Sequence, residues 1–359
     1  MESNPPLIQS YAWHVAKDTA FAAEYEDAFH VGLEHGRAAI ADGVSSAIFS
    51  GRWARILTKR LVEDPPDISQ SDGWTKWLAE PRRLWLEDID FPRMPIHQKN
   101  KLRQAGGAFC TLCWIEFLSL PDSDDGVRRC RLRSFALGDS CLLHIRSGQL
   151  LRSFPLTESH EFGLDPDSVC SVATSRDGQQ RLATTELECI DGDVIVLVTD
   201  AIGDWMLASV ENGNPAPWEQ LWTLDEAEWT AAIEQLRDAN IMKRDDTTMV
   251  VLQVGDGDPV WSRPQPTLDE NASPSSIEEE PNELEIGPNQ EAEPLVVFAE
   301  VGGGDPESAD GNHSSDIHDD CGIEDRSETH LESANGENTT VIPETVSAAI
   351  DDDSGLIGA

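Results

Sequence analysis

The sequence predicts an α+β fold followed by an acidic tail of different composition. Short apolar runs rich in β-branched residues alternate with turn residues, a pattern typical of strands. Two longer stretches, residues 47–62 and 72–88, instead place their apolar residues at helical spacing. The chain has 359 residues, enough for one large domain or two ordinary ones.

The clearest strand is Val194–Val198, a run of five apolar residues. Such a run indicates a strand buried on both faces of a sheet. Thr199 and Asp200 follow directly, so a carboxylate stands at the tip of the strand. Asp200 can hold a metal ion there, or it can simply cap the helix that follows, because Asp is a favoured N-cap residue. This stretch alone leaves both interpretations open.

The other predicted elements follow from the same two periodicities. Ser45 and Ser46 are expected to cap the first helix, and Pro81 is expected to break the second. Residues 156–185 show no clear pattern. The remaining strands are predicted at 28–33, 37–41, 108–118, 131–137, 141–145, 150–154 and 249–254, with one or two helices over 218–236. The strands between 131 and 154 are expected to form a meander with a turn at Ser147-Gly148.

Carboxylates stand at the ends of several predicted strands. Clustered carboxylates repel one another, and a divalent cation bound between them removes that cost. Oxygen ligands without paired His or Cys favour Mg²⁺ or Mn²⁺ over Zn²⁺, and two such ions can support in-line attack on a phosphoryl group. The acidic set therefore predicts metal-assisted phosphoester hydrolysis, unless these are scattered turn residues, which are common. The set is Glu26, Asp27, Asp42, Asp139, Asp200, Asp204, Asp245 and Asp246.

Charge and cysteine usage restrict the partners and the compartment. The net charge of −41 argues against nucleic acid and against anionic membrane surfaces. The N-terminus lacks the pattern of a secretory signal, and no apolar run approaches the ~20 residues of a membrane span. The seven cysteines are scattered, which favours reduced thiols and a cytoplasmic protein. Cys110 and Cys113 lie in one predicted strand and are expected to point to opposite faces.

The composition changes at about residue 258. From there to the C-terminus the chain has 26 acidic residues against Arg263 and Arg326, a net charge of −24. So acidic a segment buries too little apolar surface to offset chain entropy. We expect a domain over residues 1–257 and a disordered tail over 258–359. Its one apolar island, residues 295–299, is either a docking motif or a chance cluster.

Five short motifs resemble those of the protein phosphatase 2C family, in the family's order. They are Glu26-Asp27, Ala41-Asp42-Gly43, Gly138-Asp139-Ser140, Thr199-Asp200 and Asp245-Asp246-Thr247-Thr248. The resemblance covers about residues 10 to 255 and is nearest to the divergent bacterial branch. It implies a Mg²⁺- or Mn²⁺-dependent serine/threonine phosphatase that acts on phosphoproteins. It also implies a four-layer αββα sandwich of two antiparallel sheets flanked by helices.

The resemblance also implies a role for each acidic residue. Asp42 would bridge two metal ions, with help from the Gly43 carbonyl, and Asp200 and Asp245 would hold the first ion; these three carboxylates are the expected catalytic residues. Glu26 would bind the second ion. Two further pairs complete the expected set: Asp139 and Asp204 at a third, weaker site, and Asp27 and Asp246 as supports.

The chain departs from the family pattern in three ways. Asp42-Gly43-Val44-Ser45-Ser46 stands where the family often has Asp-Gly-x-Gly-Gly, Ala201 replaces a glycine, and Ala22 replaces an arginine that holds substrate phosphate in many members. One alternative is therefore a catalytically weak module that binds phosphoprotein as a regulator. Another is an interaction protein whose acidic tail is the functional part. A cognate Ser/Thr kinase is an expected partner of the phosphatase.

Overall fold

The computed structural model describes residues 6–121, 127–163, 166–174, 177, 182–214 and 217–261. The expected tail, apart from residues 258–261, lies outside the described residues, as do its apolar island and Cys321.

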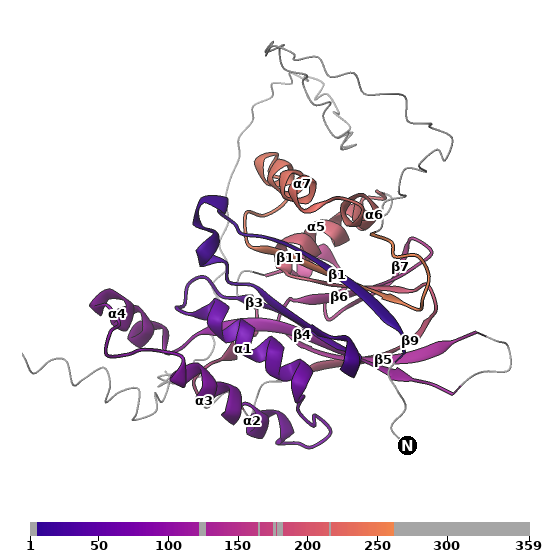
Figure 1. The fold of residues 1–359 in the computed structure, drawn as a ribbon. Coiled ribbons are helices and arrows are strands. Elements are labelled where there is room, and N and C mark those ends of the chain that lie inside the picture. Colours follow the sequence, from indigo (N-terminus) through magenta and orange to yellow (C-terminus); the bar gives the residue numbers. More distant parts are fainter. Residues whose placement is uncertain are drawn as a thin grey trace, which may run out of the picture. The chain divides into compact units, whose positions relative to one another are not determined.

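Two antiparallel sheets form the centre of the fold (Figure 1). The first has the order β2-β3-β4-β5-β9, and the second has the order β1-β11-β10-β6-β7. The first sheet consists of β2 (Ala28–Gly32), β3 (Arg37–Gly43), β4 (Phe109–Ser119), β5 (Arg129–Leu137) and β9 (Ala183–Ile190), and β8 (Val169–Cys170) pairs with β4. The second consists of β1 (Ile8–Val15), β6 (Cys141–Arg146), β7 (Gln149–Phe154), β10 (Val194–Val198) and β11 (Thr247–Val254).

Helices cover the outer face of each sheet (Figure 1). The first sheet packs against α1 (Ser50–Glu63), α2 (Gly73–Trp77), α3 (Ala79–Glu87) and α4 (Ile96–Ala105). The second packs against α5 (Asp200–Glu211), α6 (Pro217–Trp222) and α7 (Glu226–Asp238). Short 3-10 turns are η1 (Thr19–Glu24), η2 (Leu33–His35) and η3 (Ser159–Glu161). The expected four-layer αββα arrangement is confirmed.

Strand β10 shows why its sheet is covered on both faces. It is the central strand of its sheet, and all five of its residues are buried. Ile195 and Leu197 belong to the core between the sheets, whereas Val196 and Val198 pack under α5 to α7. Alternate residues of a strand point to opposite faces, so a continuous apolar run supplies two cores at once.

The first helix begins later than the sequence predicted. Helix α1 begins at Ser50, and Phe49, with φ of 61°, is its N-cap residue, so Ser45 and Ser46 do not cap it. The stretch 72–88 forms two helices that divide at Leu78. Pro81 lies in the first turn of α3, where its missing N–H removes no helical hydrogen bond.

The predicted meander is wrong in one respect. Strand β5 belongs to the first sheet and β6 to the second, so Gly138–Ser140 crosses between sheets. The predicted hairpin turn is confirmed, because β6 pairs with β7 and Ser147 and Gly148 both have positive φ. Sequence patterns missed β1 and α4, whose polar and apolar residues are too mixed to show a clear period, and most of β9, whose alternation is limited to Glu186–Cys189.

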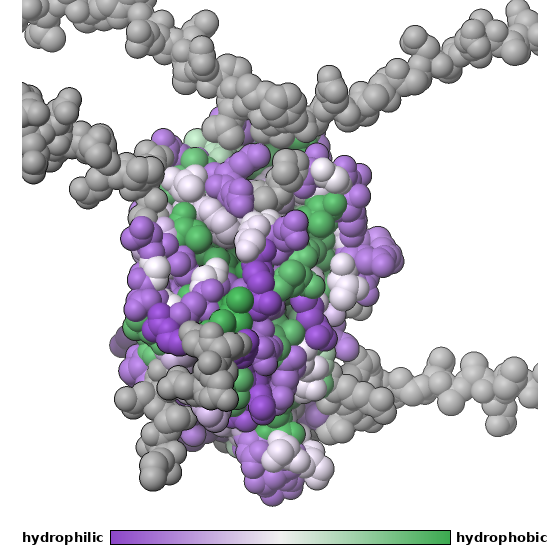
Figure 2. Space-filling view, turned by 90° about the vertical axis from the view of Figure 1, so that its right-hand side faces the viewer, coloured by the Kyte–Doolittle hydropathy of each residue, from purple (hydrophilic) through white to green (hydrophobic). Residues whose placement is uncertain are grey.

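The cysteines and the surface fit a reduced protein with a mixed exterior. The six described cysteines are buried free thiols. Cys110 packs under the helices and Cys113 between the sheets, on opposite faces as expected. Hydrophilic and hydrophobic side chains intermingle on the face in Figure 2. Of the helices in the described part of the chain, none combines the length and apolarity that a membrane crossing requires.

The described chain continues to pack past the expected boundary at Gly257. Val260 and Trp261 contact the core under α5 to α7, and the Gln253 side chain bonds to Asp258 and Val260. We predict that a chain ending at Trp261 melts within about 2 °C of the full-length protein. A chain ending at Gly257 should lose roughly 1–2 kcal/mol of burial and melt a few degrees lower. Thermal melts followed by circular dichroism test both. A large drop in melting temperature for the chain that ends at Trp261 would contradict this domain boundary.

Candidate metal centre

The acidic residues gather because their strands end on the same side of the sandwich. In the first sheet, Asp27 immediately precedes β2 and Asp42 lies at the end of β3, and the register pairs Ala28 with Ala41. In the second sheet, Asp200 follows β10, and Asp246 precedes β11; the register pairs Val198 with Met249. Asp139 lies on the crossing between the sheets.

The Asp27 carboxylate joins the two sheets at this end. Its Oδ2 accepts hydrogen bonds from Thr248 Oγ1 at 2.7 Å and Thr199 Oγ1 at 3.0 Å. The Thr248 backbone N–H in turn donates to Thr199 Oγ1 at 3.0 Å. Burial raises the pKa of Asp27 well above its usual value, and the negative charges of Asp246 and Asp200 raise it further.

Asp246 is a structural support. Its Oδ1 accepts from the Lys17 backbone N–H and its Oδ2 from the Glu26 backbone N–H, both at 2.7 Å. The carboxylate therefore ties the chain after β1 to the segment before β2. With both oxygens already bonded to N–H groups, Asp246 is better placed to orient its neighbours than to ligate an ion.

Asp42 lies at the centre of the acidic set. Burial raises its pKa well above the usual value, and the charges that raise it further are those of Asp27, Asp200, Asp245 and Asp139. These four side chains come from four different strand ends or connections that are distant in sequence. The fold therefore concentrates negative charge around one strand end.

Three buried carboxylate oxygens of this set are orphaned. Within the described residues, Asp27 Oδ1, Asp139 Oδ1 and Asp200 Oδ1 have no hydrogen-bond partner. A buried polar atom left unpaired costs about 1–3 kcal/mol, and more when it is charged. Cations bound by these oxygens would remove that cost. The donor set, made only of oxygens, suits the hard ions Mg²⁺ and Mn²⁺.

Lys243 is a cation already present at the edge of the set. Its Nζ is bound to Asp200 Oδ2 and lies 3.1 Å from Asp245 Oδ2. Burial lowers the pKa of Lys243, but the two carboxylates outweigh this and raise it overall. Asp200 is the first residue of α5, and Thr199 occupies the N-cap position. The capping interpretation of Asp200 is therefore wrong.

Gly43 and Glu26 lie against each other beside Asp42. A Cβ on Gly43 would stand 2.7 Å from the Glu26 carbonyl oxygen, so only glycine fits this approach. The Glu26 carboxylate forms an ion pair with Lys17 Nζ at 3.0 Å, and Lys17 Nζ also donates to Ser45 Oγ. The structure thus places Glu26 next to the set, with its charge already paired.

Asp139 and Asp204 are the two members of the set whose pKa values respond most clearly to the charge of Asp200 after burial. Burial, followed by the charge of Asp200, raises the pKa of Asp139 to about 7. Burial and Asp200 also raise the pKa of Asp204, which lies one turn further along α5. Both carboxylates therefore feel the charge of Asp200, and their role at a third ion stays a prediction.

Sequence patterns missed the side chains that organise the set. Lys17 has no motif around it, and Lys243 stands two residues before the Asp245-Asp246-Thr247-Thr248 motif without belonging to it. Tyr25 is bonded to Thr248 through their hydroxyls. Burial and the charge of Asp27 raise the pKa of Tyr25. The one available signal was a threonine next to an aspartate at two strand ends, Thr199 before Asp200 and Thr247 after Asp246.

A second polar cluster lies at the other end of the strands. Among the described residues, His144, Cys189 and Asp193 are the trio whose ligand atoms all lie within 4.8 Å of one another; no trio of the acidic set is so close. Asp193, however, is saturated by hydrogen bonds. It accepts from His144 Nε2, from Arg146 Nε and Nη2, and from the Ile190 backbone N–H, at 2.7–2.9 Å. This cluster is an ion-pair network with no free ligand oxygen.

Comparison with known proteins gives similarity of structure only. No family model and no curated protein matches the chain. Solved structures do match, among them the serine/threonine phosphatase PstP/Ppp of Mycobacterium tuberculosis, at 14% identity and a TM-score of 0.43 over 69% of this chain and 99% of that one. The catalytic domain of PstP in complex with two manganese ions matches at 16% identity and 0.42, with the same coverage.

A third match has a regulatory description. PppA, a regulatory component of the type VI secretion system in Pseudomonas aeruginosa, matches at 15% identity and a TM-score of 0.41, over 70% of this chain and 100% of that one. The matches include serine/threonine phosphatases, the class that the sequence motifs resemble. At these identities and TM-scores the similarity says nothing of the activity of this chain.

The raised pKa of Asp139 predicts a pH-dependent stability. Its pKa is about 7 in the folded protein and about 3.9 in an unfolded chain. The folded state therefore binds the extra proton between pH 4 and 7, and this contribution to stability is lost as the pH rises through 7. In metal-free protein, Asp139→Asn should raise the melting temperature at pH 8 by a few degrees and change it little near pH 4.

Differential scanning calorimetry across this pH range measures the effect. Asp90→Asn, an exposed carboxylate on the loop after α3, is the matched control and should show no such pH dependence. A loss of stability of equal size at pH 4 and pH 8 for Asp139→Asn would contradict the assignment, because it would indicate lost packing.

The position of Lys243 predicts competition with metal. Removing its charge in Lys243→Gln leaves Asp200 and Asp245 without their cation. The metal-free protein should melt at a lower temperature, and Mn²⁺ should stabilise the variant at a lower concentration than it stabilises the wild type. A Mn²⁺ titration followed by thermal shift measures both. Arg244→Gln is the control, because Arg244 pairs with Glu234 and Asp238 instead. An unchanged Mn²⁺ midpoint in Lys243→Gln would contradict the prediction.

Proposed function

We propose that this chain is a Mg²⁺- or Mn²⁺-dependent phosphoprotein phosphatase that hydrolyses serine and threonine phosphomonoesters. The observation that carries the proposal is the group of orphaned buried oxygens on Asp27, Asp139 and Asp200, among carboxylates that converge on Asp42. So much negative charge without paired donors is costly to bury unless cations bind there. An acidic, oxygen-only centre suits phosphoryl transfer better than chemistry that needs a softer metal.

In this proposal Asp42, Asp200 and Asp245 hold two ions, with Glu26 and the Gly43 carbonyl on the second. Asp139 and Asp204 provide a third, weaker site. When bound, the ions would supply the positive charge that activates water and neutralises the phosphoryl oxygens. The chain itself supplies rigidity. Asp27 and Asp246 are fixed by hydrogen bonds from Thr199, Thr248 and two backbone N–H groups, which limits how far the neighbouring ligands can move.

A catalytically weak regulator is the second candidate. The interaction that favours it is the ion pair of Lys243 with Asp200 and Asp245, two of the three carboxylates proposed to hold the first ion. Ala22, exposed in η1, offers no charge to a phosphate. Such a protein would bind phosphoprotein without turning it over. The partners proposed under the first candidate are phosphoprotein substrates and a cognate kinase, and hydrolysis of p-nitrophenyl phosphate separates the two candidates.

Replacing a ligand should abolish activity without unfolding the protein. We expect wild-type protein to hydrolyse p-nitrophenyl phosphate with Mn²⁺ or Mg²⁺ and to stop on addition of chelator. Asp42→Asn and Asp200→Asn should each lower kcat by at least about a hundredfold, because each removes charge and coordination but little volume. Both variants should melt at or above the wild-type temperature without metal, since self-repulsion decreases.

Two results would contradict the proposed phosphatase function. The first is turnover in either variant equal to that of the wild type, which would mean that these carboxylates hold no catalytic ion. The second is wild-type protein that binds Mn²⁺ by thermal shift yet hydrolyses neither p-nitrophenyl phosphate nor a phosphoserine peptide. That result would favour the regulator.

A further inference from the structure

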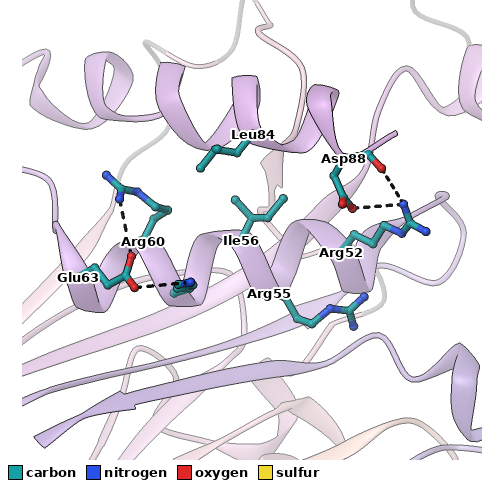
Figure 3. A pocket seen from close by; sticks show the side chains of 8 residues that line it. Arg52, Arg55, Ile56, Arg60, Glu63, Leu84 and Asp88 are labelled. Atoms are coloured by element: carbon teal, nitrogen blue, oxygen red, sulfur yellow. Dashed lines mark hydrogen bonds and ion pairs between the residues drawn. The ribbon is translucent and has the colours of Figure 1, made fainter. Parts of the chain in front are cut away.

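A groove of about 660 Å³ lies between α1 and α3, on the helical side of the first sheet. Figure 3 shows its lining seen from close by, with Ile56 and Leu84 facing each other across it. Its rim is basic: Arg52, Arg55, Lys59 and Arg60 all lie on α1. Only two carboxylates, Glu63 and Asp88, line it. The groove is thus locally positive on a chain whose net charge is −41.

The two carboxylates are already paired. Arg52 Nη1 lies 3.2 Å from Asp88 Oδ2, and Glu63 lies 3.7 Å from both Lys59 Nζ and Arg60 Nη1. Arg55, in contrast, is exposed and forms no ion pair with any carboxylate in the described ranges. The groove is therefore lined by more positive charge than its two carboxylates can neutralise.

Arg55 connects the groove to the acidic centre. A Cβ built on Gly51, at the start of α1, would lie 3.4 Å from Arg55 Nη1 and 3.0 Å from Glu26 Cα. The free guanidinium thus lies beside the segment that carries Glu26. In Figure 3 the Arg55 side chain points toward the end of α1 that carries Arg52.

We propose that this groove binds the acidic residues that flank the phosphorylated residue of a peptide substrate. The inference rests on the proposed function, because it takes the carboxylate centre as the place where the phosphate is bound. The occupant follows from charge: carboxylates of the peptide bind Arg55 and Lys59, and its aliphatic parts contact Ile56 and Leu84. A phosphopeptide with an acidic flank is therefore preferred to one with a neutral or basic flank.

The length of the groove determines how many acidic residues of the peptide it can contact. Arg52 and Arg60 are separated by eight residues of α1, which is about 12 Å along the helix axis. Extended peptide covers this distance with about four residues. Each exposed ion pair is individually weak, so the preference arises from several pairs together and decreases as the salt concentration rises.

The test compares phosphoserine peptides of equal length that carry four glutamates or four glutamines on one flank, with each flank tried in turn. Wild-type protein with Mn²⁺ should show kcat/KM about tenfold higher for the glutamate peptide at low salt, on one flank only. In the double variant Arg55→Gln/Lys59→Gln this ratio should fall to about twofold or less. Arg128→Gln is the matched control, because Arg128 is also exposed, pairs with Asp191 and Asp256 at the other end of the strands, and should keep the wild-type ratio.

Fluorescence polarisation measures binding of the same peptides, labelled with fluorescein, without any turnover. It therefore distinguishes failure of the proposed phosphatase function from failure of the proposed groove. Wild-type protein that does not hydrolyse p-nitrophenyl phosphate overturns the proposed function, and the polarisation data then still decide on the groove. Equal affinity for the two peptides overturns the groove, as does a preference that survives in the double variant. If size-exclusion chromatography shows a dimer that the double variant dissociates, a second copy occupies the groove, and the inference is also overturned.

Discussion

The carboxylate of Asp27, bonded to the hydroxyls of Thr199 and Thr248, is the contact on which the rest of the structure depends. Asp27 precedes a strand of one sheet, and the two threonines stand at strand ends of the other. Apolar packing between the sheets is not directional and does not determine how their ends meet. Hydrogen bonds to a buried charge, each contributing roughly 1.5–3 kcal/mol, do determine it. They bring Asp42, on a strand of one sheet, near Asp200, which follows a strand of the other, within one acidic cluster.

Holding these carboxylates together in a buried cluster is costly, and two features of the structure offset the cost. Lysines bind its edges, Lys17 at Glu26 and Lys243 at Asp200 and Asp245. The remaining cost shows in the pKa values of Asp27 and Asp42, which burial and mutual repulsion raise, so that a bound proton or a bound cation lowers it. Both responses are the ones expected of carboxylates held together for a purpose other than stability, since a stable fold has no need to collect them.

The sequence was informative where one local pattern determines the outcome. The apolar run Val194–Val198 correctly predicted the buried strand β10. The acidic residues at the ends of predicted strands correctly predicted which carboxylates lie close together. Patterns failed where the outcome depends on tertiary contacts. Strand β9 alternates only over a short stretch, Glu186–Cys189, directly after a polar loop, and its exposed charges are placed by pairing with β5, as Glu188 is with Arg129. The start of α1 depends on a left-handed residue at Phe49, which no cap motif signals. Lys243 reaches Asp200 only because α5 and β11 begin side by side.

The two ends of the strands show how the same residue type can serve opposite purposes. At one end, burial alone would raise the pKa of Asp193, but hydrogen bonds from Arg146, His144 and the Ile190 N–H lower it to about 2. That carboxylate is fully paired and can only stabilise the fold. At the other end, Asp27, Asp139 and Asp200 each retain a buried oxygen without a donor. A chain able to saturate Asp193 with four donors could have done the same here. Among the described residues, these unpaired oxygens are what a centre proposed to bind cations would need, and no such need exists at Asp193.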